Sequence, residues 1–304
     1  MSKANAYHTS VLLKACIENL NIRKDGVYVD LTFGGGGHSK TILNELGEKG
    51  RLFAFDQDED ALRNIPKDPR FTLIPQNFRF VKNYLRLSGV TEVDGILGDL
   101  GVSSHQFDEA ERGFSFRHEA QLDMRMNRKQ GVTAEKILNE YSEEKLVGIL
   151  KEYGEVHNAQ RAAKLILHAR TQKPILTTLE LAQVLQPMTP RFEGHKFLAQ
   201  VYQALRIEVN EEIAVLKECL TQSTEILKCG GRLVVISYHS LEDRLVKNLI
   251  RTGNVDGKEE RDPVFGTVKK IFRNLTSKPI VPDEEEIRDN TRARSAKLRV
   301  GEKL

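Results

Sequence analysis

Four apolar runs, separated by segments with helical spacing, fill the first hundred residues and constrain the fold more than any other feature. The runs are VYVDLTF (27–33), RLFAFD (51–56), RFTLIP (70–75) and VDGILGDL (93–100), and the segments between them are HSKTILNEL, DEDALRNI and NFRFVKNYLRL. Apolar residues in these segments recur at intervals of three and four, as along one face of a helix. Strands joined by short helices form right-handed crossovers, so this stretch predicts a parallel sheet.

The alternation stops after Gly101. Residues 102–130 are polar, with glycines and scattered aromatic residues, and we interpret them as a long functional loop. From Thr133 to about Gln186 only helical patterns occur. We therefore predict a loop and a helical insertion over residues 104–204, with a role in substrate recognition.

The strand pattern resumes in the last third of the chain. A helix over about 209–228 leads into the apolar run RLVVIS, and the next helix begins near Ser240, with Asp243 three residues later as in a capping box. GTVKKIF and SAKLRV are two closing strands. Residues 1–103 and 205–304 therefore predict one discontinuous α/β domain with about seven strands.

Composition limits the location and the chemistry. No stretch approaches the roughly 20 apolar residues of a membrane helix, and the opening MSKANAYHTS lacks the apolar core of a signal peptide. We expect a cytoplasmic protein whose three cysteines are reduced thiols, because none forms a C-x-x-C pair. The eight histidines show no metal-ligand spacing, so no metal is expected.

Four consecutive glycines, Gly34–Gly37, follow the first strand, where open α/β sheets bind nucleotides. The dinucleotide pattern G-x-G-x-x-G fails at its third glycine, which is Ser39 or Lys40 according to where counting begins. No G-K-[ST] sequence ends the run, so it is not a P-loop. A Rossmann-type dehydrogenase is therefore disfavoured.

Carboxylates on either side of the glycines favour S-adenosylmethionine (SAM) over NAD. Asp30 ends the first strand, Gly34 and Gly36 occupy the turn, and Asp56 ends the second strand, where its carboxylate can accept hydrogen bonds from both hydroxyls of a ribose. The alternative is a glycine-rich turn in which the acids serve only as caps.

Asp99 stands at the end of the fourth strand, beside the predicted cofactor turn. A carboxylate that accepts one N–H of an exocyclic amine localises the lone pair and helps to remove the proton as the methyl group transfers. Asp99 could equally hold the polar end of the cofactor or cap a helix. Phe114 and Phe116 either stack on a flipped base or form a local core.

The net charge of +3 is too small to indicate nucleic-acid binding, but the distribution of charge is uneven. One basic cluster lies between Arg112 and Lys129. Five cations near the end of the chain form a second: Arg292, Arg294, Lys297, Arg299 and Lys303. These clusters either contact phosphates or form solvated surface.

Several motifs occur together and in order: YHTSVLL (7–13), DLTFGGGGHS (30–39), FDQD (55–58), GDLGVSSHQFDEAERGFSF (98–116), QALRIEVN (203–210), SYHSLEDR (237–244) and RSAKLRV (294–300). In this combination the chain resembles the RsmH/MraW family of bacterial methyltransferases. The resemblance implies a class I SAM-dependent methyltransferase domain, Rossmann-like with a seven-stranded mostly parallel sheet, and an all-helical inserted domain. It also implies methylation of the N4 amine of one cytidine in the decoding centre of 16S rRNA, with the small ribosomal subunit as partner.

The resemblance assigns SAM contacts to seven residues: Gly36, Gly37, His38, Asp56, Phe78, Asp99 and Gln106. It makes Asp99 the candidate catalytic residue as well. The chain departs from the family pattern at Gly35, Gly98, His105 and Asn127, and two of these residues, Gly98 and His105, flank Asp99.

Two histidines have open assignments. His239 follows the fifth strand on the same edge as Asp99, and either touches substrate or packs beside the helix start; His8 either lies over the cofactor or on the surface. An alternative to the enzyme is a ribosome assembly factor that binds SAM or RNA without catalysis. The sequence leaves open whether the protein is a monomer or a homodimer.

Overall fold

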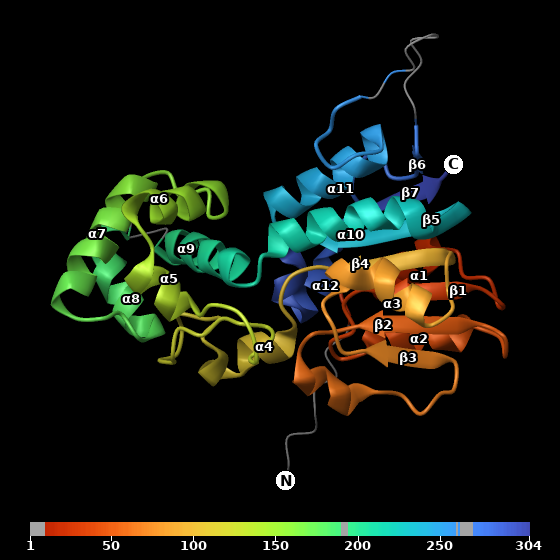
Figure 1. Cartoon of the computed structure of the whole chain (residues 1–304), viewed down its shortest axis with the longest axis horizontal. Coiled ribbons are helices and arrows are strands. Elements are labelled where there is room, and N and C mark those ends of the chain that lie inside the picture. The colour runs from red at the N-terminus through yellow and green to blue at the C-terminus, as the bar shows by residue number, and fades with distance from the viewer. Residues whose placement is uncertain (1–9, 190–193, 260, 262–269) are drawn as a thin grey trace. The chain divides into compact units, whose positions relative to one another are not determined.

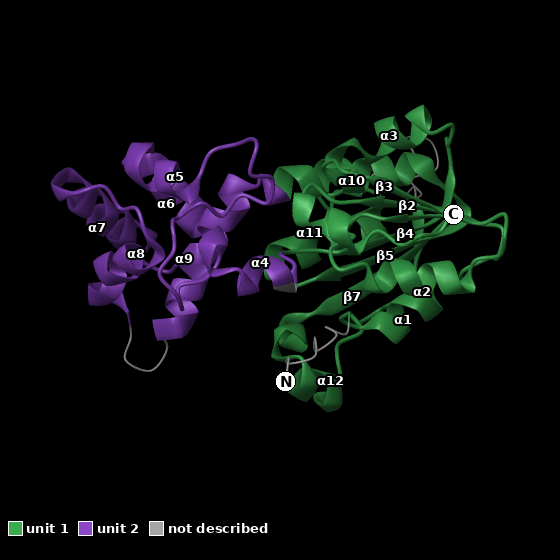
Figure 2. Cartoon of the chain, turned by 90° about the horizontal axis from the view of Figure 1, so that it is seen from below, with its two compact units in different colours: residues 1–101, 213–304 green, residues 102–212 purple. Residues whose placement is uncertain are grey.

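The computed structural model describes residues 10–189, 194–259, 261 and 270–304. The chain divides into two compact units (Figure 2). Met1–Gly101 and Ile213–Leu304 form one, here called the sheet unit, and Val102–Glu212 form the other, the helical unit. The proposed role of the insertion in substrate recognition stays a prediction.

The sheet unit contains seven strands in the order β3-β2-β1-β4-β5-β7-β6 (Figure 1). Their bounds are β1 Val27–Asp30, β2 Arg51–Phe55, β3 Phe71–Ile74, β4 Val93–Asp99, β5 Leu227–Ser237, β6 Phe272–Asn274 and β7 Lys297–Lys303. Strands β1 to β5 run parallel, while β7 pairs antiparallel with both β5 and β6. The predicted seven-stranded, mostly parallel sheet is confirmed. Of the predicted strand GTVKKIF, residues 266–269 lie outside the described residues.

Side chains of the central strands alternate between two cores. Val29, Phe53 and Ile96 face one core, and their neighbours Tyr28, Leu52 and Leu97 face the other. This alternation follows from the pleat of a strand, which turns successive side chains to opposite faces. Both faces are apolar because both are covered by helices.

Helices cover both faces of the sheet (Figure 1). One core includes residues of α3 (Val81–Leu87), α10 (Glu212–Ile226) and α11 (Ser240–Thr252). The other includes residues of α1 (Leu13–Leu20) and α2 (Gly37–Glu45). Shorter helical turns complete the unit: η1 Glu59–Asn64, η2 Phe78–Phe80, α12 Glu284–Asp289 and η5 Thr291–Ser295.

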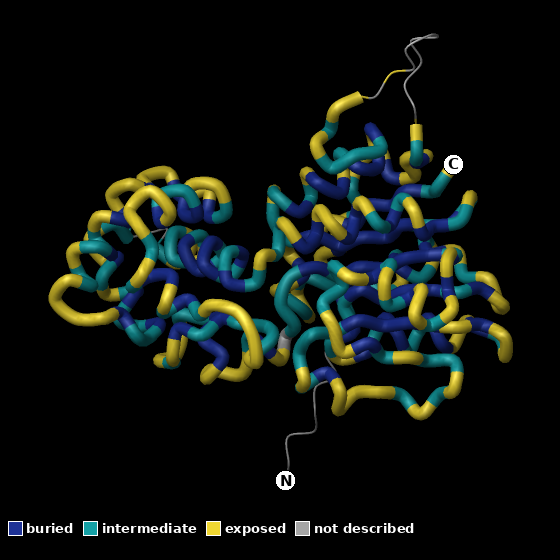
Figure 3. The backbone as a smooth tube through the Cα atoms, in the orientation of Figure 1, coloured by how far each residue is buried: buried dark blue, intermediate teal, exposed yellow. Residues whose placement is uncertain are grey.

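The helical unit has a core of its own, shown by the buried segments of Figure 3. Its elements are α4 Ser104–Asp108, η3 Ala110–Arg112, α5 Ala134–Glu140, α6 Glu143–Glu152, α7 Ala159–Gln172, α8 Thr178–Leu185, η4 Gln186–Met188 and α9 Gly194–Val209. The segment 102–130, which we interpreted as a long loop, contains two short helical elements, α4 and η3. Among the described residues, no helix combines the length and hydrophobicity that crossing a bilayer requires.

The start of α11 differs from the predicted capping box. The N-cap is His239, which makes no capping hydrogen bond through its side chain, and Ser240 is already the first helical residue. The Asp243 carboxylate is held by Arg299 of β7, 3.0 Å from Nη2. A charge-assisted pair is stronger than a neutral capping bond, so this pairing with a distant strand competes successfully with the local pattern.

Candidate functional site

The glycine turn between β1 and α2 requires glycine at two positions. Gly36, the N-cap of α2, has a φ of 75°, and a Cβ there would meet the Phe33 ring at 2.9 Å. A Cβ at Gly37 would lie 2.0 Å from Ser10 Oγ. By contrast, a Cβ at Gly35 meets nothing within 4 Å, so there is space for a side chain at that position. Helix α2 begins without a side-chain cap, and its first amides can therefore bind a carboxylate.

Asp30 ties the end of β1 to the first turn of α2. Its side chain accepts from Ser39 Oγ at 2.6 Å and from the Thr32 amide at 3.0 Å. Only 1% of the residue is exposed, and burial raises the pKa of the carboxyl. These two hydrogen bonds of the buried Asp30 therefore stabilise the conformation of the turn.

Asp56, just after β2, joins the same turn from the neighbouring strand. Its two oxygens accept from the amides of Gly34 and Asp58, each at 2.8 Å. Burial raises the pKa of the Asp56 carboxyl to about 6. Each carboxylate oxygen has a second lone pair, so both can still accept from a ribose diol while holding the backbone.

Asp99 ends β4 and has a different set of neighbours. Its Oδ1 accepts from the Tyr238 hydroxyl at 2.7 Å, and its backbone amide donates to Thr32 Oγ1 at 2.7 Å. Oδ2 lies 3.9 Å from His38 Nδ1, and the side chain is 23% exposed. Burial raises the pKa of this carboxyl to about 6, while the nearby His38 and the Tyr238 hydroxyl act in the opposite direction.

The buried His38 ring presents a defined nitrogen to Asp99. Its Nε2 lies 3.1 Å from the Val11 carbonyl, which can only accept, so Nε2 carries a hydrogen. In the neutral ring Nδ1 is an acceptor toward Oδ2 of Asp99, whereas in the protonated ring it carries a hydrogen and the positive charge lowers the pKa of that carboxyl. With the ring neutral, the two acceptors suit a hydrogen-bond donor that contacts both, such as an amino group.

Sequence reasoning missed Tyr238. This residue follows β5, the neighbour of β4, and its amide donates to Glu242 Oε2 at 2.9 Å. Burial and the adjacent Asp99 raise the pKa of the phenol, so Tyr238 stays a donor to that carboxylate. The signal was present in the motif SYHSLEDR, but the partner lies 139 positions away in the sequence.

His239 packs at the start of α11. Its Nε2 lies 3.1 Å from Glu242 Oε1, with the His239 and Glu242 side chains 8% and 4% exposed. Neither ring nitrogen makes a hydrogen bond to another described residue. His8, the other histidine considered, lies outside the described residues.

The remaining predicted cofactor contacts occupy two places. Phe78 begins η2, after β3, and is half-buried against the core of the sheet unit. Gln106 belongs to the helical unit, where it forms a capping box with Ser103 at the start of α4. Gly36, Gly37, His38, Asp56, Phe78 and Asp99 belong to the sheet unit. All seven assignments stay predictions.

Several cations of the two predicted phosphate-binding clusters are paired within the protein. Arg112 is 3% exposed and donates to the carbonyls of Arg125 and Met126, and the Arg125 guanidinium pairs with Asp123. Arg299 is 8% exposed and pairs with Asp243. These cations are structural. Six others remain exposed: Arg117, Arg128, Lys129, Arg292, Arg294 and Lys297.

The two phenylalanines of the predicted loop pack within the helical unit. Phe114 is 5% exposed and belongs to its core. Phe116 stacks with His195 at a centroid distance of 6.0 Å and meets Tyr202 edge-on at 5.3 Å. The local-core interpretation therefore describes them better than a base-stacking platform.

A parallel α/β sheet with a glycine turn after β1 and acids ending β1 and β4 defines a Rossmann-like domain of the class I methyltransferase type. Comparisons with known proteins agree. The model of the MraW methylase family matches residues 5–304, so the chain belongs to the MraW methylase family.

Close relatives match over nearly their whole length. "Ribosomal RNA small subunit methyltransferase H" of Bacteroides fragilis (strain YCH46) is 56% identical over 297 residues, 98% of this chain and 97% of the relative. The protein of the same name from Flavobacterium johnsoniae is 56% identical over 304 residues, 100% of both chains. A solved rRNA methylase from Streptococcus thermophilus is 14% identical, with a TM-score of 0.40, over 96% of this chain and 93% of that one. The predicted family, class I fold and SAM cofactor are confirmed.

Proposed function

We propose that this protein transfers the methyl group of SAM to the N4 amine of a cytidine in small-subunit rRNA. Family membership supports methyl transfer, and relatives at 56% identity named as small-subunit rRNA methyltransferases support the class of substrate. The choice of N4 and of the decoding centre rests on the sequence resemblance. We expect the reaction to occur in the cytoplasm, on 16S rRNA or the small subunit.

The observation that carries the proposal is the set of contacts around Asp99. A hydroxyl donor occupies Oδ1, and Oδ2 faces an acceptor nitrogen, which leaves Oδ2 suited to an N–H group. With a pKa of about 6, Asp99 is mostly ionised at pH 7 and can accept that hydrogen. A cytosine amine needs such an acceptor because its lone pair is otherwise delocalised into the ring.

The residues of the sheet unit fit the cofactor on chemical grounds. The uncapped amides at the start of α2 suit the carboxylate of its methionine portion, and Asp56 suits the ribose diol. His38 Nδ1 and Asp99 Oδ2 also suit its ammonium group, and this contact is the alternative role for Asp99. Phe78 and Gln106 complete the proposed contacts. When bound, SAM supplies a methyl group on a positively charged sulfur.

In the proposed reaction Asp99 accepts one N–H of the amine, and this localises the nitrogen lone pair on N4. With SAM bound, the sulfonium group would supply the methyl carbon to this lone pair, and the electron pair of the carbon–sulfur bond would remain on sulfur. The amine proton passes to Asp99 and then to solvent. Tyr238 holds the carboxylate in place throughout.

A covalent route through cysteine has little support. Cys16 and Cys219 are buried, and burial raises the pKa of both thiols. A thiol held neutral in an apolar environment is a poor nucleophile. Cys229 is exposed, but it lies near the start of β5, whereas Asp99 pairs with Ile236 near the end of that strand. Direct transfer to nitrogen fits the available groups better.

The test is incorporation of labelled methyl from SAM into small subunits purified from cells that lack this gene, followed by nucleotide mapping. We expect label on N4 of a single cytidine. Label on another atom or in another RNA would contradict the proposed specificity. SAM binding without any incorporation would instead favour a non-catalytic assembly factor.

A further inference from the structure

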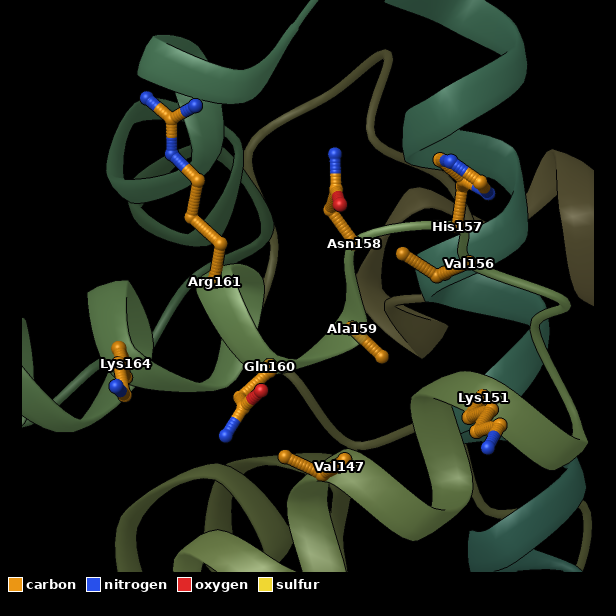
Figure 4. A pocket seen from close by; sticks show the side chains of 9 residues that line it. All are labelled: Val147, Lys151, Val156, His157, Asn158, Ala159, Gln160, Arg161 and Lys164. Atoms are coloured by element: carbon orange, nitrogen blue, oxygen red, sulfur yellow. The ribbon is translucent and has the colours of Figure 1, made fainter.

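The helical unit carries a surface cavity of about 490 Å³ at the start of α7 (Figure 4). Its apolar residues are Val147, Val156 and Ala159. The other side chains that line it are polar, and three of them, Lys151, Arg161 and Lys164, are positively charged. We call this cavity the α7 cradle.

The charge of the α7 cradle is unbalanced. Its nine lining residues include no carboxylate, and the imidazole of His157 adds another donor. Glu152, the acid nearest in sequence to Lys151, lines a different cavity. Arg161 and Lys164 are three apart on one helix, and like charges at this spacing destabilise the helix slightly. An anionic ligand would offset that repulsion.

The three cations are also unpaired, unlike others in the same unit. Arg170 donates to two carbonyls, and Lys173 pairs with Glu180. Within the described part of the chain, Lys151, Arg161 and Lys164 are all exposed, and their side chains make no hydrogen bond or ion pair. Nothing in the folded unit therefore explains their clustering.

The helix start adds donors to the same place. Asn158, the N-cap of the 14-residue helix α7, makes no capping hydrogen bond through its side chain, and the first turn contains no acid. Helices α6 and α8 of the same unit begin with capping side chains and acids. The free amides of the first turn of α7 and the positive end of its dipole therefore favour an anion at the cradle.

We propose that the α7 cradle binds the phosphodiester backbone of small-subunit rRNA. Figure 4 shows Lys151 and Lys164 on opposite sides of the helix start, with Asn158 and Gln160 between them. Cations spread in this way suit successive phosphates of a chain better than one compact anion. The apolar residues can contact a ribose or a base. This inference rests on the proposed function, because it takes rRNA as the substrate.

Charge reversal tests the cradle. Arg161→Glu and Lys164→Glu are compared with Lys136→Glu, which changes the charge equally at an exposed site on α5 of the same unit. Glutamate is favourable in the first turn of a helix, so Arg161→Glu should fold normally. Thermal unfolding checks this, and Arg161→Gln serves as a milder second variant.

The readouts are affinity for small subunits across a salt series, SAM affinity, and the kinetics of methylation. Each cradle variant should lower affinity for subunits about tenfold and reduce the slope of log K against log salt by about 1, as expected for a lost phosphate contact. KM for subunits should rise with little change in kcat, and SAM affinity should stay constant. Lys136→Glu should stay within about twofold of wild type.

Two results would overturn the proposal for the cradle, and only the second would also overturn the proposed function. If the wild type methylates subunits and the cradle variants keep its salt slope and KM, the cradle is wrong and the proposed function stands. If the wild type neither binds nor methylates subunits, both are wrong.

Discussion

The two units differ in how their functional charged side chains are placed. At the strand ends of the sheet unit, Asp30, Asp56 and Asp99 are held by close donors, and burial raises the pKa of each carboxyl. In the helical unit, the cations of the α7 cradle are exposed and unpaired. Methyl transfer needs groups fixed to within a fraction of an ångström, whereas a polyanion can be bound by mobile cations that adapt to it. Under the proposed function, the sheet unit would carry out the chemistry and the helical unit would attract the RNA.

The contrast between the two units depends most on Asp99 being required for methyl transfer. Asp99→Ala should lower turnover about 10³-fold, because a positioned proton acceptor contributes on this order. Single-turnover methylation of small subunits measures it, with Asp99→Asn as the variant of equal shape. A full-rate mutant would exclude the role in activating the amine. A collapse of SAM affinity with unchanged single-turnover rate at saturating SAM would make Asp99 a cofactor contact only.

Buried and exposed cations should differ in stability. Arg299→Ala removes the partner of the largely buried Asp243 and should lower the free energy of unfolding by about 3 kcal/mol. Arg161→Ala, in the cradle, should change it by less than about 0.5 kcal/mol. Urea denaturation of both variants makes the measurement. Equal losses would show that the cradle arginine is structural after all.

Asp56→Ala should weaken SAM binding by about 10- to 100-fold, equivalent to the loss of one or two hydrogen bonds to a charged group. Part of the loss should come from the glycine turn, because the Gly34 amide loses its acceptor. Calorimetric titration with SAM gives the affinity, and Asp56→Asn shows how much depends on charge. An unchanged affinity of Asp56→Ala for SAM would contradict this prediction.

The smallest effect concerns Tyr238. Asp99 must be ionised to accept a hydrogen, so turnover should rise with pH through about 6. Tyr238→Phe removes a hydrogen bond to the ionised form, which raises the pKa of Asp99 further and moves this rise to higher pH. At pH 7 we expect turnover to fall about tenfold, with recovery toward pH 8. A uniform loss at every pH would point to a packing role instead.

The strand ends were predictable because their signals are local. Apolar runs mark β1, β2 and β4, and an acid ends or directly follows each, so Asp30, Asp56 and Asp99 could be assigned to one edge of the sheet. Tyr238 could not be assigned in this way, since its hydrogen bond to Asp99 depends on β5 lying next to β4.

Cations were the least predictable residues. In sequence, Arg112 and Arg299 look like members of basic clusters, but carbonyls and a carboxylate contributed by distant segments bury them. The α7 cradle was missed for the opposite reason. Its cations are spread over α6 and α7 and converge only when the helices pack.

The position of β7 has a consequence for biosynthesis. This strand follows all the others in the chain, yet it lies inside the sheet between β5 and β6. During synthesis, β6 emerges before β7. Until β7 is available, β6 has no strand to pair with and the edge of β5 stays unpaired. Truncation before Lys297 would delete only β7, but β6 would also be lost from the sheet because it pairs through β7. The edge of β5 would then be exposed and could associate with other chains.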